Sequence, residues 1–280
     1  MNQYKCVKQL REGKYIMHSD LDLFRQGHLS DAIESISQSV KRDQSDILAR
    51  SRLVEYLCVA SKFDRADKQL DIIASQDSKT IVRVMELRQI VRASMARLEM
   101  IKEGRVPEFI SEPPEHVKNR LKALVCMRDG DMNECAQWLK KAENARPSIS
   151  GYMGENHFDD LRDLDDFFGG VLEVLTTTGR YMWVPIEHVF EANFVTSKRP
   201  IDSAWREVEL SLRNGPSGMV YIPSLYLDEN EIISNDALSI GLETDWLENE
   251  FGITRGRGLK TFLLGDKCFT IHELTEIRVE

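Results

Sequence analysis

Two segments near the start of the chain repeat each other at an interval of 34 residues. The recurring positions are Leu23, Gly27, Leu29, Ala32, Ile36, Val40 and Asp43, matched by Leu57, Ser61, Phe63, Ala66, Leu70, Ala74 and Asp77. This is the tetratricopeptide period, in which a small residue lies at the turn between two helices and alanine lies where the helices cross. Such a unit cannot bury its apolar face alone, so the repeat predicts stacked helical hairpins.

A third, weaker copy follows, and a long helix is predicted before it. The third copy consists of Gly130, Met132, Cys135, Leu139 and Arg146. The long helix runs roughly from Lys79 to Glu103, with Val84, Leu87, Val91, Leu98 and Ile101 on one apolar stripe. Four arginines lie off that stripe: Arg83, Arg88, Arg92 and Arg97. This basic face is either a solvated surface or a surface for an acidic partner.

The two halves of the chain differ in charge. Residues 1–150 carry a net charge of +4 and residues 151–280 carry −13, within 280 residues that total −9. This asymmetry predicts a helical domain at 1–150 and a second domain at 151–280. The acidic half disfavours nucleic acid and anionic membranes as partners. No apolar stretch approaches the ~20 residues that span a bilayer, so we predict a cytoplasmic protein without membrane insertion.

The junction between the halves is rich in aspartate. Apolar residues recur here at helical spacing, at Leu161, Leu164, Phe168 and Leu175. Five aspartates lie in the first part of this run, between Asp159 and Asp166. Carboxylates favour the first turns of a helix, so an Asp-rich helix is predicted here. Gly179 is placed to end that helix, and Tyr181 to Pro185 reads as a strand buried on both faces.

The remainder of the chain reads as β structure. Strands are predicted at 189–196 and 205–212, with Asn214-Gly215 as a hairpin turn and a second hairpin turn at Gly265-Asp266. The fold class is therefore predicted to be α+β. Tetratricopeptide-like helical hairpins come first, and a mainly antiparallel β domain follows, with the Asp-rich helix at the junction.

No motif for catalysis, cofactors or metals is recognised. An EF-hand loop that began at Asp159 would need glycine at its sixth position and glutamate at its twelfth, but Leu164 and Gly170 stand there. The sequence contains no G-x-S-x-G and no P-loop, and its cysteines show no zinc-like spacing. We therefore predict a protein without enzymatic activity, cofactor or metal.

A set of motifs in the second half resembles the ImpE/SciE family, also called TagJ. They are Phe158, Asp163-Leu-Asp165, Gly169, Leu172-Glu173, Gly179-Arg-Tyr-Met-Trp-Val-Pro185, Pro200-x-Asp202-x-x-Trp205, Ile222-Pro223 with Tyr226, Thr244-Asp-Trp246 and Gly256-x-Gly258-x-Lys260. Lys260 stands where the family pattern leads us to expect arginine. The resemblance covers roughly residues 21–279. It implies an accessory protein of a bacterial type VI secretion system that binds the N-terminal helix of the small contractile-sheath subunit, TssB.

Two functions are carried forward from the sequence. In the favoured one, a non-catalytic adaptor takes an amphipathic helix of the sheath subunit in a groove between helices. The candidate partner-binding residues are Arg83, Arg88, Arg92, Arg180 and Trp183. The family-motif residues expected to be structural are Asp163, Asp165, Gly179, Tyr181, Pro185, Asp202, Trp205 and Trp246.

The alternative function is a hydrolase or small-ligand binder. It would use a polar cluster of Asp163, Asp165, Arg180 and Asp202, and the burial of these side chains distinguishes the two functions. The oligomeric state stays open.

The first residues have no counterpart in the repeat. The family resemblance begins near Leu21, just after Met17, and codons for Arg11-Glu12-Gly13 could spell a purine-rich ribosome-binding site. We therefore expect a native start at Met17, with residues 1–16 as a non-native extension.

Overall fold

The computed structural model describes residues 19–196, 199–227 and 236–280. The extension predicted at residues 1–16 lies outside the described residues. In the described part the helices are α1 (Asp20–Arg25), α2 (Leu29–Arg42), α3 (Ile47–Val59), α4 (Phe63–Gln76), α5 (Ile81–Glu103), α6 (Glu115–Asp129), α7 (Met132–Ala145) and α8 (Asp236–Ser239). None of these described helices is long and apolar enough to cross a membrane.

The predicted repeat forms helical hairpins. The turns α1–α2, α3–α4 and α6–α7 each contain a residue with a positive φ, namely Gly27 (92°), Ser61 (53°) and Gly130 (81°). A left-handed residue lets the chain reverse within a few residues, which explains why small residues recur at these positions. Ala32 and Ala66 are completely buried where their helices cross, as the repeat predicts.

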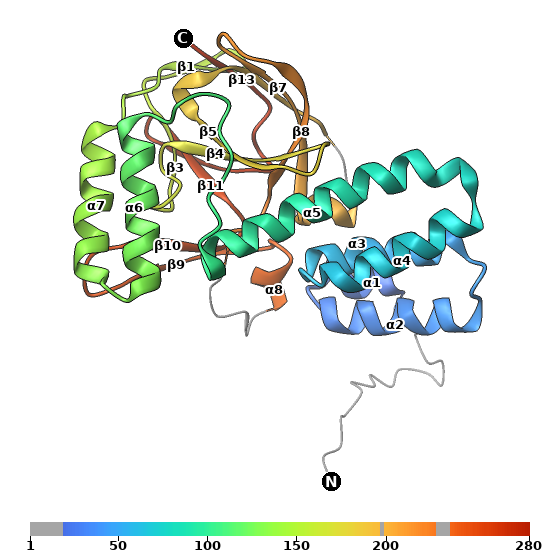
Figure 1. Cartoon of the computed structure of the whole chain (residues 1–280). Helices are drawn as coiled ribbons and strands as arrows, with labels where there is room; N and C mark the ends of the chain where they lie inside the picture. The colour runs from blue at the N-terminus through green and yellow to red at the C-terminus, as the bar shows by residue number, and fades with distance from the viewer. Residues whose placement is uncertain (1–18, 197–198, 228–235) are drawn as a thin grey trace, which may run out of the picture.

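Helix α5 connects two separate groups of helices (Figure 1). Helix α4 packs on α5, and hairpin α1–α2 packs in turn on α3. The α6–α7 hairpin lies on the other side of the β strands. The third copy of the repeat is therefore a hairpin that does not extend the first stack. The domain boundary near residue 150 falls between α7 and β1 and stays a prediction.

The strands form one large antiparallel sheet and two small ones, which confirms the predicted α+β class. They are β1 (Gly151–Met153), β2 (Asn156–Phe158), β3 (Leu161–Asp163), β4 (Val171–Thr176), β5 (Tyr181–Pro185), β6 (Val189–Phe194), β7 (Trp205–Leu212), β8 (Ser217–Pro223), β9 (Thr244–Glu248), β10 (Thr254–Gly258), β11 (Thr261–Leu264), β12 (Lys267–Thr270) and β13 (Glu276–Val279). The large sheet has the order β2-β1-β13-β6-β7-β8-β4-β5, and the small sheets are β10-β9 and β12-β11-β3. The predicted hairpin turns join β7 to β8 and β11 to β12.

The predicted Asp-rich helix is wrong. Residues 158–176 form the end of β2, then β3, a loop and β4. The aspartates make turns instead of filling a helix N-terminus: Asp163 accepts the backbone N–H of Asp165 at 2.9 Å, and Asp165 accepts that of Phe167 at 3.0 Å. Such local bonds offer the backbone an alternative to a helix. Residues 171–175 are all buried, so the apolar run is a strand covered on both faces.

Gly179 has the predicted left-handed conformation in a different element. Its φ is 85°, and it lies in the hairpin turn between β4 and β5. The Gly179 N–H donates to the carbonyl of Thr176 at 3.0 Å, and the Thr176 N–H donates to the carbonyl of Arg180 at 2.9 Å. Strand β5, which ends at Pro185, is buried throughout as predicted.

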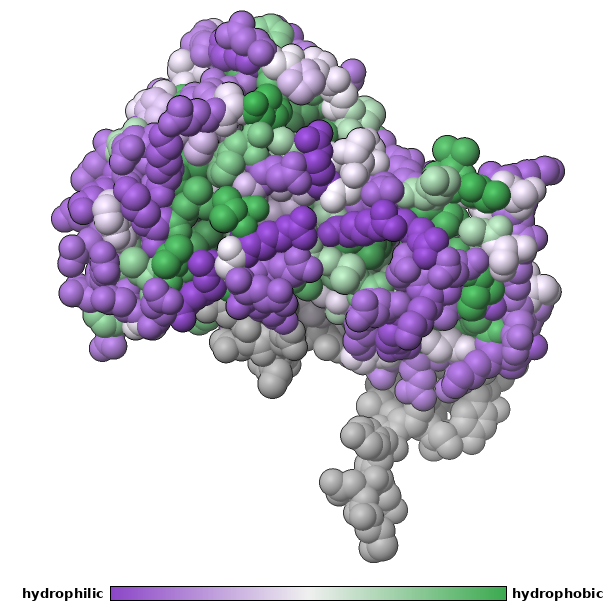
Figure 2. All heavy atoms as spheres, in the orientation of Figure 1, coloured by the Kyte–Doolittle hydropathy of each residue, from purple (hydrophilic) through white to green (hydrophobic). Residues whose placement is uncertain are grey.

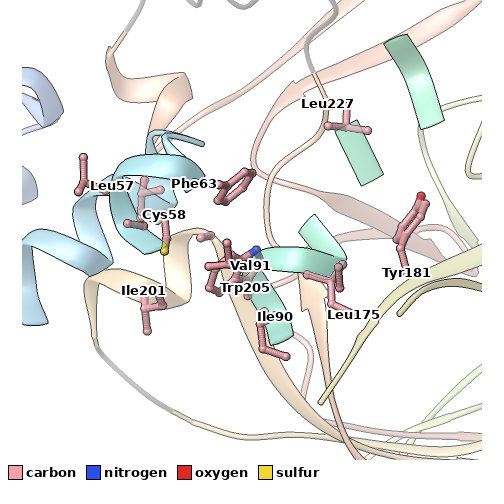
Figure 3. Packing of buried hydrophobic residues seen from close by; sticks show 14 of the residues in the cluster. Leu57, Cys58, Phe63, Ile90, Val91, Leu175, Tyr181, Ile201, Trp205 and Leu227 are labelled. Carbon is pink, nitrogen blue, oxygen red and sulfur yellow. The ribbon is translucent and has the colours of Figure 1, made fainter. Parts of the chain in front are cut away.

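One apolar cluster joins the helices to the β strands. Figure 3 shows Leu57, Cys58 and Phe63 from α3 and α4 facing Ile90 and Val91 of α5, with Trp205 of β7 beside them. The rings of Phe63 and Trp205 stack with their centroids 6.2 Å apart. A second cluster fills the space among the strands themselves. The helical and β parts therefore share buried apolar surface, which is the main driving force for their association.

Two adjacent glycines allow α6 to approach the loop before β4. A Cβ atom on Gly169 would lie 2.8 Å from Nη2 of Arg120, and one on Gly170 would lie 2.8 Å from the ring of His116. Both α6 side chains are buried, and His116 Nε2 lies 2.7 Å from Oε1 of Glu187. The imidazole is thus fixed from one side by Glu187 and from the other by the glycine backbone.

Replacing Gly170 by alanine tests this contact. We expect Gly170→Ala to lower the free energy of unfolding by about 1–3 kcal/mol, because the added methyl overpacks a fixed ring. Gly218→Ala is the matched control, since a Cβ there meets nothing within 4 Å, and it should change stability by less than about 0.5 kcal/mol. Chemical denaturation measures both, and equal effects would contradict the close approach of α6.

Candidate functional site

Asp163 is the last residue of β3 and Asp165 follows two residues later, and both side chains are fully buried. Asp163 Oδ2 lies 2.7 Å from Nζ of Lys260, and Asp163 Oδ1 accepts the Tyr226 hydroxyl at 2.7 Å. Asp165 Oδ2 accepts Nε of Arg255 at 2.9 Å and the backbone N–H of Gly256 at 3.0 Å. Both carboxylates are therefore satisfied by protein groups, which is the structural role that the sequence predicts for them.

A buried ion pair next to them joins α5 to the large sheet. Arg97 of α5 donates Nε and Nη2 to the two carboxylate oxygens of Glu173 on β4, each at 2.7 Å. The Arg97 Nη2 group also donates to the carbonyl of Leu225 at 3.0 Å. A forked pair of this kind fixes orientation as well as distance. Arg97 and Glu173 therefore set where the long helix lies on the β strands.

Further side chains connect this pair to Asp163. Lys260 Nζ lies 3.1 Å from Oε2 of Glu173, and the Tyr181 hydroxyl donates to Oε1 of Glu173 at 2.6 Å. Trp183 Nε1 donates to the Tyr181 hydroxyl at 2.6 Å. We call the connected set the central network: Arg97, Asp163, Glu173, Tyr181, Trp183, Tyr226 and Lys260. All seven side chains are buried, and two of them, Arg97 and Tyr226, also line the cavity beside α5 that is described below.

Charge balance keeps Glu173 and Lys260 of the central network ionised. Burial by itself would raise the pKa of Glu173, but the charges of Arg97 and Lys260 outweigh burial and lower this pKa to about 2. Burial would also lower the pKa of Lys260, but the charges of Asp163 and Glu173 raise it. Each ion is stabilised by the others, as a buried charge requires.

The pairing of Arg97 with Glu173 was not predicted from the sequence. The sequence pattern places Arg97 on an exposed basic face, although this side chain is buried. A signal was present: Ala93, Ser94 and Ala96 precede Arg97, and all three are buried. Small buried residues next to an arginine indicate that other elements cover the helix on more than one side. The arginine side chain then extends beyond these small residues and pairs with a buried carboxylate.

The alternative polar site is not assembled. Arg180 is exposed in the β4–β5 turn, where its Nη1 lies 3.6 Å from Oε2 of Glu108. Asp202 is half-buried in the short 3-10 helix Pro200–Ser203 and accepts the backbone N–H of Arg199 at 2.7 Å. Asp163 and Asp165 have the buried partners given above. The four residues of the proposed hydrolase site are thus engaged separately rather than gathered in a cleft.

The tryptophans of the family motif differ in environment. Trp183 is 0% exposed, with its ring edge against Phe168, so it cannot contact a partner in this structure. Trp205 is also buried. Trp246 of β9, by contrast, is 37% exposed beside Tyr226. The expectation of a structural core role therefore fits Trp205 better than Trp246.

The arginines of α5 do not form one continuous basic face. Arg83 and Arg92 are exposed. Arg88 is held by two carboxylates of α4, with Nε 2.6 Å from Oδ1 of Asp67 and Nη2 2.6 Å from Oδ1 of Asp71. Of the predicted partner surface, Arg83 and Arg92 remain exposed, and they lie on opposite sides of the helix.

Apolar side chains are exposed at the N-terminal end of α5. Ile81, Val82 and Met85 are 40%, 79% and 59% exposed. Figure 2 shows apolar surface gathered at this end of α5, away from the β strands. We call these three residues the α5 tip. Contiguous apolar surface at the end of a helical stack is typical of a site that binds another chain.

A cavity of about 460 Å³ lies where α5, the α3–α4 turn and β7 meet. Phe63, Leu98, Trp205 and Leu227 supply apolar lining, and Lys62 lies at its wall. Asp163, Asp165, Arg180 and Asp202 are not among its lining residues. In the described residues, no group of three or more His, Cys, Asp or Glu side chains is arranged to hold a metal ion.

Removing one charge of the central pair should destabilise the protein strongly. We expect Glu173→Gln to lower the free energy of unfolding by about 3–5 kcal/mol, because Arg97 keeps its charge and loses its ionic partner in a buried place. The control is Glu191→Gln, which breaks an exposed contact with Arg278 and should cost less than about 1 kcal/mol. Urea denaturation gives both values. A loss for Glu173→Gln no larger than the control would refute a stabilising role for the pair.

The same pair predicts an acid dependence. The pKa of Glu173 in the folded protein, about 2, is below its ordinary value of 4.5. Its contribution to stability is therefore present above pH 4.5 and is lost as the pH falls toward 2. The stability difference between the wild type and Glu173→Gln should narrow by about 2 kcal/mol between pH 5 and pH 2.5. Denaturation curves across this range test it, and a constant difference would be inconsistent with the lowered pKa.

Known proteins resemble this chain in sequence and in structure. A sequence model described as the ImpE protein matches residues 155–278. The type VI secretion system accessory component TagJ of Pseudomonas aeruginosa is 29% identical over 255 residues, covering 90% of this chain and 89% of TagJ. The crystal structure of protein VPA1032 from Vibrio parahaemolyticus superposes with a TM-score of 0.85 at 26% identity, covering 93% of this chain and 97% of that one.

The matched region contains most of the central network. Asp163, Glu173, Tyr181, Tyr226 and Lys260 all lie within residues 155–278. The likeness to TagJ extends over most of the chain, so it is not confined to the β strands. Residues 155–278 of this chain therefore match the ImpE sequence model, and the chain as a whole is similar to TagJ.

Proposed function

We propose that this chain is an accessory component of a bacterial type VI secretion system and acts as a non-catalytic adaptor. The observation that carries the proposal is its likeness to TagJ over 90% of the chain. The geometry supports the same role, because the charged residues of the family motif are buried and bound to one another. We infer a cytoplasmic location from this role.

We propose further that the partner is the N-terminal helix of the small contractile-sheath subunit, bound at the α5 tip. An amphipathic helix binds through apolar anchors spaced at i, i+3, i+4 and i+7. Val82 and Met85 offer exposed apolar surface for such anchors. Arg92 lies on the same side of α5 as Ile81 and Met85, at spacings of 11 and 7 residues, and would meet an acidic flank of the partner helix.

The hydrolase alternative has less support. Its four residues are engaged separately, and they do not line the cavity beside α5. The adaptor role is therefore the one that the site favours.

Charge and apolar changes on α5 test the binding surface. A peptide of the sheath subunit's N-terminal helix is titrated onto the full chain in a calorimeter. Met85→Asp should weaken binding at least tenfold, because it removes an exposed apolar anchor and adds a charge. Arg92→Glu should weaken binding severalfold at low salt and less at high salt, since rim charges act mainly on association.

Arg83→Glu is the matched control. Arg83 lies nine residues before Arg92, about two and a half turns away, and so faces the opposite side of the helix. This variant carries the same charge change and should bind normally. If Arg83→Glu weakens binding as much as Arg92→Glu, the α5 tip is not the site. If only Arg180→Glu weakens it, the β4–β5 turn is the site, and no binding by the wild type would refute the sheath-helix partner.

A further inference from the structure

The small β9–β10 sheet has one edge anchored to the molecule and one edge open. The backbone N–H groups of Thr254 and Gly256 on β10 donate to the carboxylates of Asp166 and Asp165, at 2.6 and 3.0 Å. Strand β10 is thereby fixed to the loop before β4. In the described part of the chain, β9 pairs with β10 and with no other strand.

The direction of the β9 backbone groups follows from the register. Trp246 lies opposite Gly256, and Glu248 lies opposite Thr254. The backbone N–H groups of Gly256 and Thr254 point away from β9, toward Asp165 and Asp166. The pairs Gly256–Trp246 and Thr254–Glu248 are therefore the pairs of the ladder that exchange no backbone hydrogen bonds. The backbone hydrogen bonds between β9 and β10 are made by the odd-numbered residues. The same pattern is seen just beyond β9, where the Asn249 N–H donates to the Ile253 carbonyl at 3.1 Å.

The even-numbered residues of β9 therefore direct their N–H and C=O groups away from β10. The Trp246 N–H donates to the side chain of Asp245 at 2.9 Å, so a strand that pairs here takes the place of this carboxylate. We call the outward backbone groups of Thr244, Trp246 and Glu248 the β9 edge. An open edge of this kind is a template for another extended chain.

The side chains around the β9 edge combine apolar and acidic groups. Trp246, Leu247 and Phe251 are 37%, 47% and 42% exposed. Asp245, Glu248 and Glu250 are exposed beside them. No lysine, arginine or histidine occurs between Arg213 and Arg255, a span that contains eight aspartates and glutamates. The surface thus offers apolar contact beside three exposed carboxylates, of which Asp245 lies opposite Arg257 of β10.

We propose that the β9 edge binds an extended, basic segment of a partner protein, which adds to the sheet as a strand. Main-chain hydrogen bonds to Trp246 and Glu248 provide affinity, and alternate side chains provide specificity. Lysine or arginine in the segment faces Glu248, which shares a face of the strand with Trp246, and apolar side chains pack on Leu247 on the opposite face. This interaction is independent of the α5 tip and of the identity of the partner there.

A second copy of this chain is a poorer occupant. Pairing β9 with another β9 sets two acidic strands side by side, and like charges across a ladder are destabilising. A basic segment removes this repulsion and is attracted by the same residues.

A designed peptide tests the proposal with the full chain. The probe is an eight-residue peptide of alternating lysine and valine, with both termini blocked. The control is the same peptide with glutamate in place of each lysine. We expect the lysine peptide to bind and the glutamate peptide to bind at least tenfold more weakly. N-methylation of alternate residues along one edge of the lysine peptide should abolish binding, because it removes the donors that pair with β9.

Two substitutions at Glu248 distinguish the contribution of its charge to peptide binding from that of its backbone N–H. Glu248→Gln removes the charge, whereas Glu248→Pro removes the charge and the outward N–H while leaving the ladder to β10 intact. We expect the proline variant to bind at least tenfold more weakly than the glutamine variant, with an unchanged melting temperature. Glu155→Lys, at an exposed site between β1 and β2, should bind normally. Equal binding by the glutamine and proline variants, equal binding of the N-methylated peptide, or dimerisation through β9 would overturn the proposal.

Discussion

The forked ion pair between Arg97 and Glu173 determines how this molecule is assembled. It joins the middle of α5 to β4 across fully buried surface, with both oxygens of the carboxylate engaged at 2.7 Å. Two charges removed from water are tolerated only where each has close partners. Lys260 and Tyr181 supply the remaining contacts of Glu173. Through α5, the pair also fixes the position of the helical hairpins that pack on it (Figure 1).

This arrangement explains why polar residues of the family motif occur without a site. Asp163, Tyr181 and Lys260 could serve chemistry if they lined a cleft, but here they bind one another in the interior. The surfaces that we propose for partners are exposed apolar groups on α5 and β9. One is flanked by an arginine and the other by acidic residues, so the two surfaces favour partners of opposite charge.

The sequence predicted the elements better than it predicted their contacts. The 34-residue repeat located the hairpin turns at Gly27 and Ser61, because a left-handed turn residue and a buried alanine leave local signals. The run from Asp163 to Leu175 was misread, because apolar residues at helical spacing also occur in a strand that is buried on both faces. Asp163 and Asp165 were expected to be structural, and both are buried with protein partners. Arg97 was not found, since its partner lies 76 residues away and no local pattern connects them.

The most direct measurement is a double-mutant cycle on the central pair, with Arg97→Met, Glu173→Leu and the combined variant. Because the two side chains form a single forked contact, each single change leaves one buried charge without its partner, and the double change removes both charges. The account predicts a coupling free energy of about 2–3 kcal/mol, with the double variant more stable than either single one. A coupling free energy near zero would contradict the claim that this pair holds α5 to the sheet.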